Sequence, residues 1–294
     1  MLAKVAALLV VSGTCVGAPA HAWVQYLTGE AAGCGLRWYA DDTGTLPTVI
    51  PVQLDDRGVD GVTLPELQKV TQTALTAWQT TTCAGANGAT SPVRVAFSFA
   101  GTAPPTAVGG KCKDDAVPCK IKESNGNFVR AIKGSEDWPY GSTVFALTYL
   151  TYDTCTGEIV DGDVLLDDKF HKFCGTTCAP TQQSLSNTLT HEIGHLLGLD
   201  HSQASEATMD NSGPSGQTKK STLHGDDRQG VCAIYTGGCG RTHNCKAAAT
   251  AGAATQASGC QAAPTGPGTS SAAVLGASCG LVGLWLTRRK WSRR

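Results

Sequence analysis

The sequence lacks a charge excess of either sign, long apolar runs and paired cysteine knuckles, and each absence narrows the class of protein. Its 23 Lys and Arg nearly balance 24 Asp and Glu, so the formal net charge is −1. This balance argues against nucleic acid and against any other strongly charged partner. No apolar run reaches the roughly 20 residues that a membrane-spanning helix needs. The cysteines do not form the CxxC pairs of a zinc ribbon.

Cysteine itself is abundant, with 13 residues spread over a chain of 294. A cytosolic protein rarely carries so many, whereas an exported protein uses them as disulfides. The N-terminus agrees, because Lys4 precedes an apolar run over residues 5–11 and then Ala20-His21-Ala22. That order is typical of a signal peptide, so we expect residues 1–22 to be removed after Ala22.

Eight cysteines lie within residues 23–238, enough for four disulfides whose connectivity does not follow from the sequence. They are Cys34, Cys83, Cys112, Cys119, Cys155, Cys174, Cys178 and Cys232. We expect Cys174 and Cys178 to close a small loop, and Cys112 and Cys119 to staple the long loop over residues 101–142.

Residues 191–201 read His-Glu-Ile-Gly-His-Leu-Leu-Gly-Leu-Asp-His and carry the clearest chemical signal. His191 and His195 are four residues apart, so on a helix both rings lie on one face and can bind one Zn²⁺. Gly198 predicts the end of that helix in a left-handed conformation, after which the chain can turn and bring His201 to the metal. Three histidines leave a fourth position for water, which is the catalytic arrangement.

This stretch resembles the zinc helix of the metzincin metalloproteases. The dipeptide His201-Ser202 is similar to the matrixin, or matrix-metalloprotease-like, branch, and residues 207–210 (Ala-Thr-Met-Asp) resemble the Met-turn of that family. Apart from the initiator, Met209 is the only methionine in the chain. The resemblance implies that Met209 packs under the metal. The likeness covers about residues 36–236 and is strongest at the motif.

The resemblance implies an exported zinc-dependent endopeptidase with a catalytic Zn²⁺ bound by His191, His195 and His201. A metal-activated water would attack the scissile carbonyl, with Glu192 as the general base that later passes the proton to the leaving amine. Protein or peptide substrates and a monomeric enzyme are expected. Substrate preference is expected to depend on loop residues at about 203–222, beside the Met-turn.

The alternative is a catalytically silent surface or binding protein that keeps the metzincin fold. Intact Glu192 argues against it, because a silent relative has no reason to retain the base. A zinc hydrolase acting on a non-peptide bond is a third interpretation, which the extended motif disfavours. A buried helix with three satisfied core histidines would be the purely structural explanation.

The patterns predict an α+β, metzincin-like catalytic domain over residues 23–238. It has a twisted mixed sheet, two long helices, one of them carrying the zinc motif, and a C-terminal helix. Thr63 and Glu66 predict a capping box, and the helix that they start buries Leu67, Val70, Ala74 and Trp78. Helices are expected at residues 63–80, 184–197 and 223–235, and strands at residues 36–40, 48–54, 93–99, 144–152 and 159–167.

The family resemblance carries further expectations. The edge strand before the zinc helix pairs with an extended substrate, and residues 159–167 lie where that strand is expected. Structural Ca²⁺ is plausible at Asp-rich turns such as residues 55–56 and 167–168, although no EF-hand loop is present and solvated turns are favoured. Cys34 faintly resembles a cysteine switch, but the flanking residues are absent and a plain disulfide is favoured. Three other histidines are expected at the surface: His171, His224 and His243.

The C-terminal part changes in composition. Residues 239–271 are rich in Ala, Gly, Thr, Ser and Pro, which is typical of a solvated linker. Residues 272–294 combine an apolar stretch with a basic end, and resemble a C-terminal sorting signal of the Gram-negative envelope, similar to the myxobacterial type with its cysteine. A sorting peptidase would then be a partner, and the protein would be secreted or held at the cell surface or outer envelope. A permanent membrane anchor is the rival interpretation.

Overall fold

The structure is a computed structural model of the chain, which divides into two units, residues 1–263 and 264–294. All described residues belong to the first unit. They are residues 22–26, 35–39, 48–85, 87–104, 111–112, 121–123, 126–153, 156–236 and 253–258, and for 111–112, 121–123 and 253–258 only the backbone is described.

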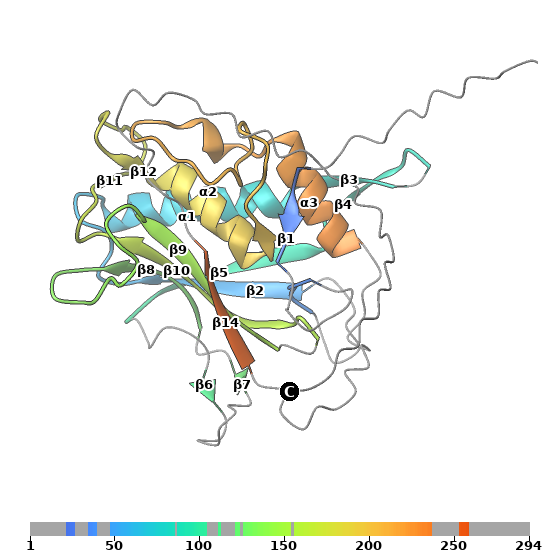
Figure 1. The fold of residues 1–294 in the computed structure, drawn as a ribbon, viewed down its shortest axis with the longest axis horizontal. Helices are drawn as coiled ribbons and strands as arrows, with labels where there is room; N and C mark the ends of the chain where they lie inside the picture. Colours follow the sequence, from blue (N-terminus) through green and yellow to red (C-terminus); the bar gives the residue numbers. More distant parts are fainter. Residues whose placement is uncertain are drawn as a thin grey trace, which may run out of the picture. The chain divides into compact units, whose positions relative to one another are not determined.

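A six-stranded mixed sheet forms one layer of the fold, in the order β14-β9-β10-β8-β2-β5 (Figure 1). Four neighbouring strands run parallel, from β5 through β2 and β8 to β10, while β9 is antiparallel to both β10 and β14. The strands are β2 (Thr48–Asp55), β5 (Val95–Ala103), β8 (Asn127–Ile132), β9 (Ala146–Asp153), β10 (Ile159–Asp167) and β14 (Ala253–Ser258).

Two long helices pack together against this sheet, and a third follows near the end of the domain (Figure 1). They are α1 (Leu64–Gln79), α2 (Leu185–Leu196) and α3 (Gly225–Thr236). The Trp78 indole of α1 is fully buried and donates to the backbone carbonyl of Thr190 in α2 at 2.8 Å. The predicted α+β architecture of a mixed sheet and three helices is confirmed.

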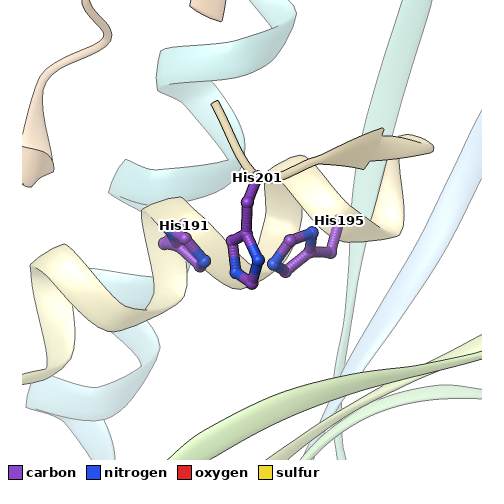
Figure 2. Close-up of side chains that lie close together, drawn as sticks. All are labelled: His191, His195 and His201. Carbon is purple, nitrogen blue, oxygen red and sulfur yellow. The ribbon is translucent and has the colours of Figure 1, made fainter. Parts of the chain in front are cut away.

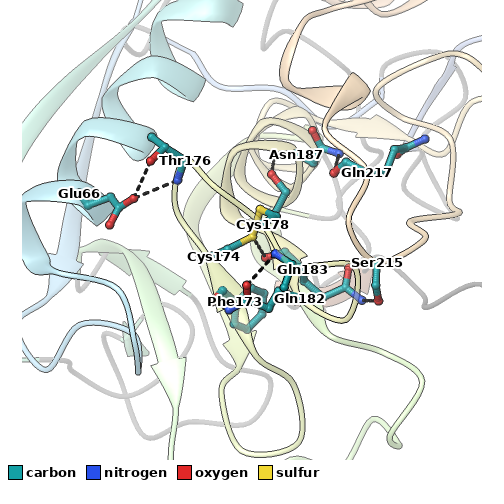
Figure 3. Close-up of a disulfide and its surroundings, with 12 residues drawn as sticks. Glu66, Phe173, Cys174, Thr176, Cys178, Gln182, Gln183, Asn187, Ser215 and Gln217 are labelled. Atoms are coloured by element: carbon teal, nitrogen blue, oxygen red, sulfur yellow. Dashed lines mark hydrogen bonds between the residues drawn. A yellow bond between two sulfur atoms is a disulfide. The ribbon is translucent and has the colours of Figure 1, made fainter.

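Helix α1 begins with half of the predicted capping box. The Thr63 hydroxyl accepts from the Glu66 backbone N–H at 3.4 Å, as expected of an N-cap. The Glu66 carboxylate does not accept from the Thr63 backbone N–H, as a full capping box requires. It accepts instead from the backbone N–H and hydroxyl of Thr176 at 2.9 and 3.0 Å (Figure 3). Glu66 therefore ties the first turn of α1 to the loop before α2.

Short two-stranded pairs and one 3₁₀ turn complete the described elements. The pairs are β1 (Val24–Gln25) with β13 (Leu199–Asp200), β3 (Thr82–Ala84) with β4 (Thr90–Pro92), β6 (Lys111–Cys112) with β7 (Ile121–Glu123), and β11 (Phe173–Cys174) with β12 (Gln183–Ser184); the 3₁₀ turn is η1 (Lys219–Ser221).

The strand predicted at residues 36–40 is wrong for its described part, residues 36–39. There the structure has only an isolated bridge, between Arg37 and Glu158. The backbone of Leu36 is engaged elsewhere: its N–H donates to the Tyr26 carbonyl at 2.7 Å, and its carbonyl accepts from the Gln25 side chain at 3.0 Å.

The prediction that residues 159–167 form the substrate-facing edge is also wrong. This segment is β10, which is paired on both sides, with β9 and β8. At Gly162 an added Cβ would lie 2.3 Å from the Leu196 side chain, so α2 packs directly on this strand. Periodicity alone does not say which of two consecutive antiparallel strands is the outer one.

Residues 253–258 lie inside the predicted linker and nevertheless form a strand, β14, paired with β9. Two disulfides join described residues, Cys83–Cys232 and Cys174–Cys178, and the second confirms the predicted small loop (Figure 3). Cys34, for which a plain disulfide is favoured over a cysteine switch, lies outside the described residues, as do residues 105–110, 113–120 and 124–125 of the 101–142 loop, Cys119 among them.

Within the described part of the chain, no helix is both long enough and apolar enough to cross a membrane. The predicted signal peptide up to residue 21 and the predicted sorting tail at residues 272–294 lie outside that part.

Candidate metal centre

Helix α2 supplies two of the three predicted metal ligands. Ser184 caps its start, accepting from the Asn187 backbone N–H at 3.4 Å. The expected apolar stripe is buried, with exposures of 0–1% at Leu185, Leu189, Ile193 and Leu196. Packing of this stripe fixes the helix, so that His191 and His195 project from it on the side where the third ligand approaches (Figure 2).

Gly198 turns the chain after the helix, as the sequence predicts. Its φ is +94°, and an added Cβ would lie 2.2 Å from the Leu36 carbonyl oxygen, so both conformation and space require glycine here. The following residues form β13, and the His201 backbone N–H donates to the Asp200 carboxylate at 2.7 Å. Asp200 therefore stabilises the bend that brings His201 back towards α2.

The three imidazoles converge (Figure 2). Their nearest ligand atoms all lie within 4.8 Å of one another, and the ring centroids of His191, His195 and His201 are 4.7 to 5.3 Å apart. The Nε2 atom of each ring is buried and has no hydrogen-bond partner. A buried nitrogen without a partner is costly unless a ligand uses it. Three imidazole nitrogens are the donor set that a catalytic zinc ion takes in proteins.

Backbone carbonyls set the tautomers of the two helical histidines. His191 Nδ1 donates to the Thr208 carbonyl at 2.6 Å, and His195 Nδ1 donates to the Leu199 carbonyl at 2.8 Å. Each Nε2 therefore carries a lone pair, which is the form a metal binds. The Tyr26 hydroxyl also lies 3.1 Å from His195 Nδ1.

Burial keeps the triad neutral. Desolvation, together with repulsion from neighbouring histidines, lowers the pKa of His195 to about 3 and that of His191 well below its ordinary value of 6.5. Burial also lowers the pKa of His201. Metal binding needs deprotonated imidazoles, so this electrostatic environment fits a cation bound by the three Nε2 atoms.

Met209 packs beneath the ligand helix. The side chain is 1% exposed, and an added Cβ on Gly194 would lie 2.2 Å from its sulfur. The carboxylate of Asp227, in α3, accepts from the backbone N–H groups of Thr208 and Met209 at 2.8 and 3.0 Å. Helix α3 thus holds the turn whose Thr208 carbonyl orients the first histidine. The sequence marks Asp227 only as an acidic residue at a helix start.

Glu192 is fully buried beside the triad and meets a residue that sequence reasoning missed. The Thr148 hydroxyl, on β9, lies 2.8 Å from both the backbone carbonyl and the carboxylate Oε2 of Glu192, and donates to one of them. Nothing in the local pattern around Thr148 marks this contact, because it depends on how β9 packs against α2.

A small pocket opens next to the first ligand. Its volume is about 20 Å³, room for about one water molecule. Two buried amide oxygens there, Asn187 Oδ1 and Gln217 Oε1, have no hydrogen-bond partner. The Asn187 amide donates to the Gln217 backbone carbonyl at 2.6 Å (Figure 3). The lining residues are Phe145, Gln183, Ser184, Asn187, Thr188, His191, Ser212, Gly213, Pro214, Gln217 and Lys220.

The acidic turns considered for Ca²⁺ are largely engaged by protein groups. The Asp55 carboxylate accepts from the Arg57 guanidinium at 2.9 Å, and Asp168 Oδ2 accepts from the Asp60 backbone N–H at 2.7 Å and lies 3.3 Å from the Lys133 ammonium. Among the residues described, only the histidine triad gathers three or more ligand groups. The calcium prediction stays a prediction.

The other predicted surface histidines lie away from the triad where the structure describes them. His224 is exposed, and His171 Nε2 donates to the Ser142 carbonyl at 3.0 Å. His243 lies outside the described residues.

Comparison with known families and proteins gives one match. A family model described as Matrixin covers residues 57–236, which include the triad, Glu192 and Met209. No curated protein matches the sequence.

Proposed function

Because the chain belongs to the matrixin family, we propose that it is a zinc-dependent endopeptidase whose catalytic centre is the histidine triad. The observation that carries the proposal is the convergence of three buried, unpartnered Nε2 atoms beside a buried glutamate. His191, His195 and His201 would hold the ion. A zinc ion bound there would supply Lewis-acid polarisation of the scissile carbonyl and lower the pKa of a water molecule.

Glu192 is the proposed general base. It would take the proton of the attacking water and pass it to the leaving amine, the two transfers that peptide hydrolysis requires. Thr148 orients its carboxylate through the hydroxyl contact at 2.8 Å. Full burial of Glu192 limits the competition of bulk water for these proton transfers.

The test is Glu192→Ala in the full chain. We expect zinc content to stay near one ion per chain while hydrolysis of casein falls by about 10²–10⁴-fold, the usual contribution of a general base. Glu206→Ala is the matched control, because that side chain is 68% exposed and pairs only with exposed Lys219. Wild-type cleavage rates in the Glu192 variant would refute the assignment.

The silent-protein alternative makes a different prediction for the same assay. It expects zinc binding without cleavage in the native chain, so the native chain and the Glu192 variant would behave alike. The buried Thr148–Glu192 contact favours the enzyme, since a binding protein gains nothing from a preorganised base.

For the substrate, we propose that the pocket beside His191 receives the side chain that follows the scissile bond. Its small volume and the free acceptors of Asn187 and Gln217 favour a small side chain that donates a hydrogen bond, such as serine or threonine. A large apolar side chain would leave both acceptors desolvated and unpaired, which costs about 1–3 kcal/mol each.

Export is proposed on the sequence pattern and on one contact. The backbone nitrogens of Ala22 and Trp23 both lie 3.1 Å from Asp226 Oδ1. Cleavage after Ala22 would convert the second nitrogen into an ammonium facing a carboxylate. Sorting at the C-terminus, attachment to the envelope, a monomeric state and structural calcium remain proposals from resemblance alone.

A further inference from the structure

We propose that residues 253–258 are a built-in competitor of the substrate, which occupy in cis the sheet edge that an extended peptide must use to reach the metal centre. The inference rests on the proposed function. Its observation is independent of the histidine triad: β14 pairs antiparallel with β9 over six residues, from Ala253 opposite Asp153 to Ser258 opposite Thr148.

Without β14, strand β9 would be the outer strand of the sheet on the side of the catalytic helix. Its inner neighbour is β10, and β9 packs against α2. A free edge offers a row of unpaired N–H and C=O groups, to which an extended peptide can add as a further strand. The edge of β9 is thus the surface on which a substrate backbone would be aligned.

The direction of β14 leads towards the catalytic residues. Its last residue, Ser258, is opposite Thr148, the residue whose hydroxyl contacts Glu192. A peptide lying on β9 in the same antiparallel sense would likewise run from Asp153 towards the metal centre. Residues 253–258 and a bound substrate therefore require the same backbone groups of β9.

The composition of β14 suits an exchangeable occupant. It reads Ala-Ala-Thr-Gln-Ala-Ser, with no large apolar side chain, and lies beyond residue 236, where the match to the family ends. Its pairing must then rest on main-chain hydrogen bonds, which do not depend on sequence and which any extended peptide can replace. Attachment through the chain raises its effective concentration at the edge.

The test weakens the strand without removing it. Thr255→Pro/Gln256→Pro in the full chain removes two consecutive backbone N–H groups. Alternate residues of a strand point their N–H groups to opposite sides, so one of the two lost donors is the one that faces β9. Thr255→Ala/Gln256→Ala is the matched control that keeps both donors. Each pair is placed in the zinc-loaded Glu192→Ala background, so that a bound substrate stays intact.

Two measurements are made on these chains. Fluorescein-labelled casein reports substrate binding by anisotropy, and hydrogen exchange reports the outward-facing amides of residues 148–153. If β14 covers the edge nine-tenths of the time, the proline pair should lower the Kd for casein about tenfold. The same amides should exchange faster than in the alanine control.

Equal casein affinity in the proline and alanine chains would overturn the inference, whatever the exchange rates. This outcome is separate from failure of the proposed function, which would appear as absence of casein cleavage by the native chain carrying Glu192.

Discussion

At the scale of single residues, the site depends on histidine Nε2 atoms that carry no proton and so keep a lone pair for a metal ion. His191 and His195 each donate one N–H to a backbone carbonyl and are otherwise desolvated. The histidine spacing could be predicted from the sequence, because helix geometry alone fixes it. The use of the Thr208 and Leu199 carbonyls as acceptors could not be predicted, because every residue has a backbone carbonyl whatever its side chain.

The depressed histidine pKa values predict acid sensitivity of the metal-free protein. His195 has a pKa of about 3 when folded and about 6.5 when unfolded, so between these values the unfolded chain binds more protons. The contribution of His195 to the free energy of unfolding is therefore complete above pH 6.5. It falls on acidification from pH 6.5 towards pH 3, by up to about 1.4 kcal/mol per pH unit for each such residue. Urea titrations of chelated protein across this range measure it.

His195→Gln is the comparison for that experiment, because glutamine cannot titrate. The variant should show a shallower dependence of unfolding free energy on pH. Identical slopes would mean that His195 is not held neutral. Zinc occupancy should also decline over this range, since protons compete for the same lone pairs.

The pocket also gives a prediction at the residue scale. Gln217→Leu removes one free acceptor beside His191 and makes the lining more apolar. A peptide-library cleavage profile should then shift from serine and threonine towards alanine and valine after the scissile bond, by about tenfold in relative rate for each 1.4 kcal/mol recovered. Gln72→Leu, at an exposed position of α1 outside the loop at residues 203–222, should leave the profile unchanged. An unaltered preference in the Gln217 variant would remove this pocket from substrate selection.

At the scale of elements, the positions of helices were easier to predict from the sequence than the order in which strands pair in the sheet. The N-cap at Thr63, the buried face of α1 and the approximate bounds of α2 follow from local pattern, and the structure has all three. Strand order does not follow from local pattern. The run over residues 159–167 is compatible with either an inner or an outer strand, and only its pairing with both β8 and β9 shows that it is an inner one.

The two disulfides join elements at very different sequence separations, 149 residues for Cys83–Cys232 and 4 for Cys174–Cys178. The first links β3, just after α1, to α3. On the chain-entropy account, closing the long loop is worth about 5 kcal/mol and the short one about 2 kcal/mol. Thermal unfolding of the two paired Cys→Ser variants should therefore show the larger loss of Tm for Cys83→Ser/Cys232→Ser. A larger loss from the short loop would contradict the entropic ranking.

At the scale of the whole catalytic unit, the two ends of the domain meet at one carboxylate. Asp226, in α3, faces the backbone nitrogens of Ala22 and Trp23 and accepts from the Ser202 hydroxyl at 2.6 Å. Ser202 follows the third ligand directly. Residue 226 therefore connects residues 22–23, helix α3 and the bend that carries His201, a long-range relation that no local motif predicts.

Asp226→Asn tests this connection in the processed protein. If Trp23 is the first residue, its ammonium should pair with the buried carboxylate, and loss of that charge should destabilise the fold by about 1.5–3 kcal/mol. Chemical unfolding of chains beginning at Trp23 measures it. In chains that begin at Ala20, the Ala22 and Trp23 nitrogens that face Asp226 are both uncharged amides, and the same substitution should cost less. An equal cost in both would exclude the ion pair.

The pairing of Val24–Gln25 with Leu199–Asp200 has a practical consequence for anyone preparing this enzyme. The bend that presents His201 pairs with a strand that lies directly after the predicted cleavage site, and Tyr26 of the same stretch contacts His195. In a chain that begins at Trp23, proteolytic removal of only four or five residues would remove contacts that support two ligands at once. Retention of zinc through dialysis would then report, more sensitively than mass or solubility, whether this N-terminal strand is intact.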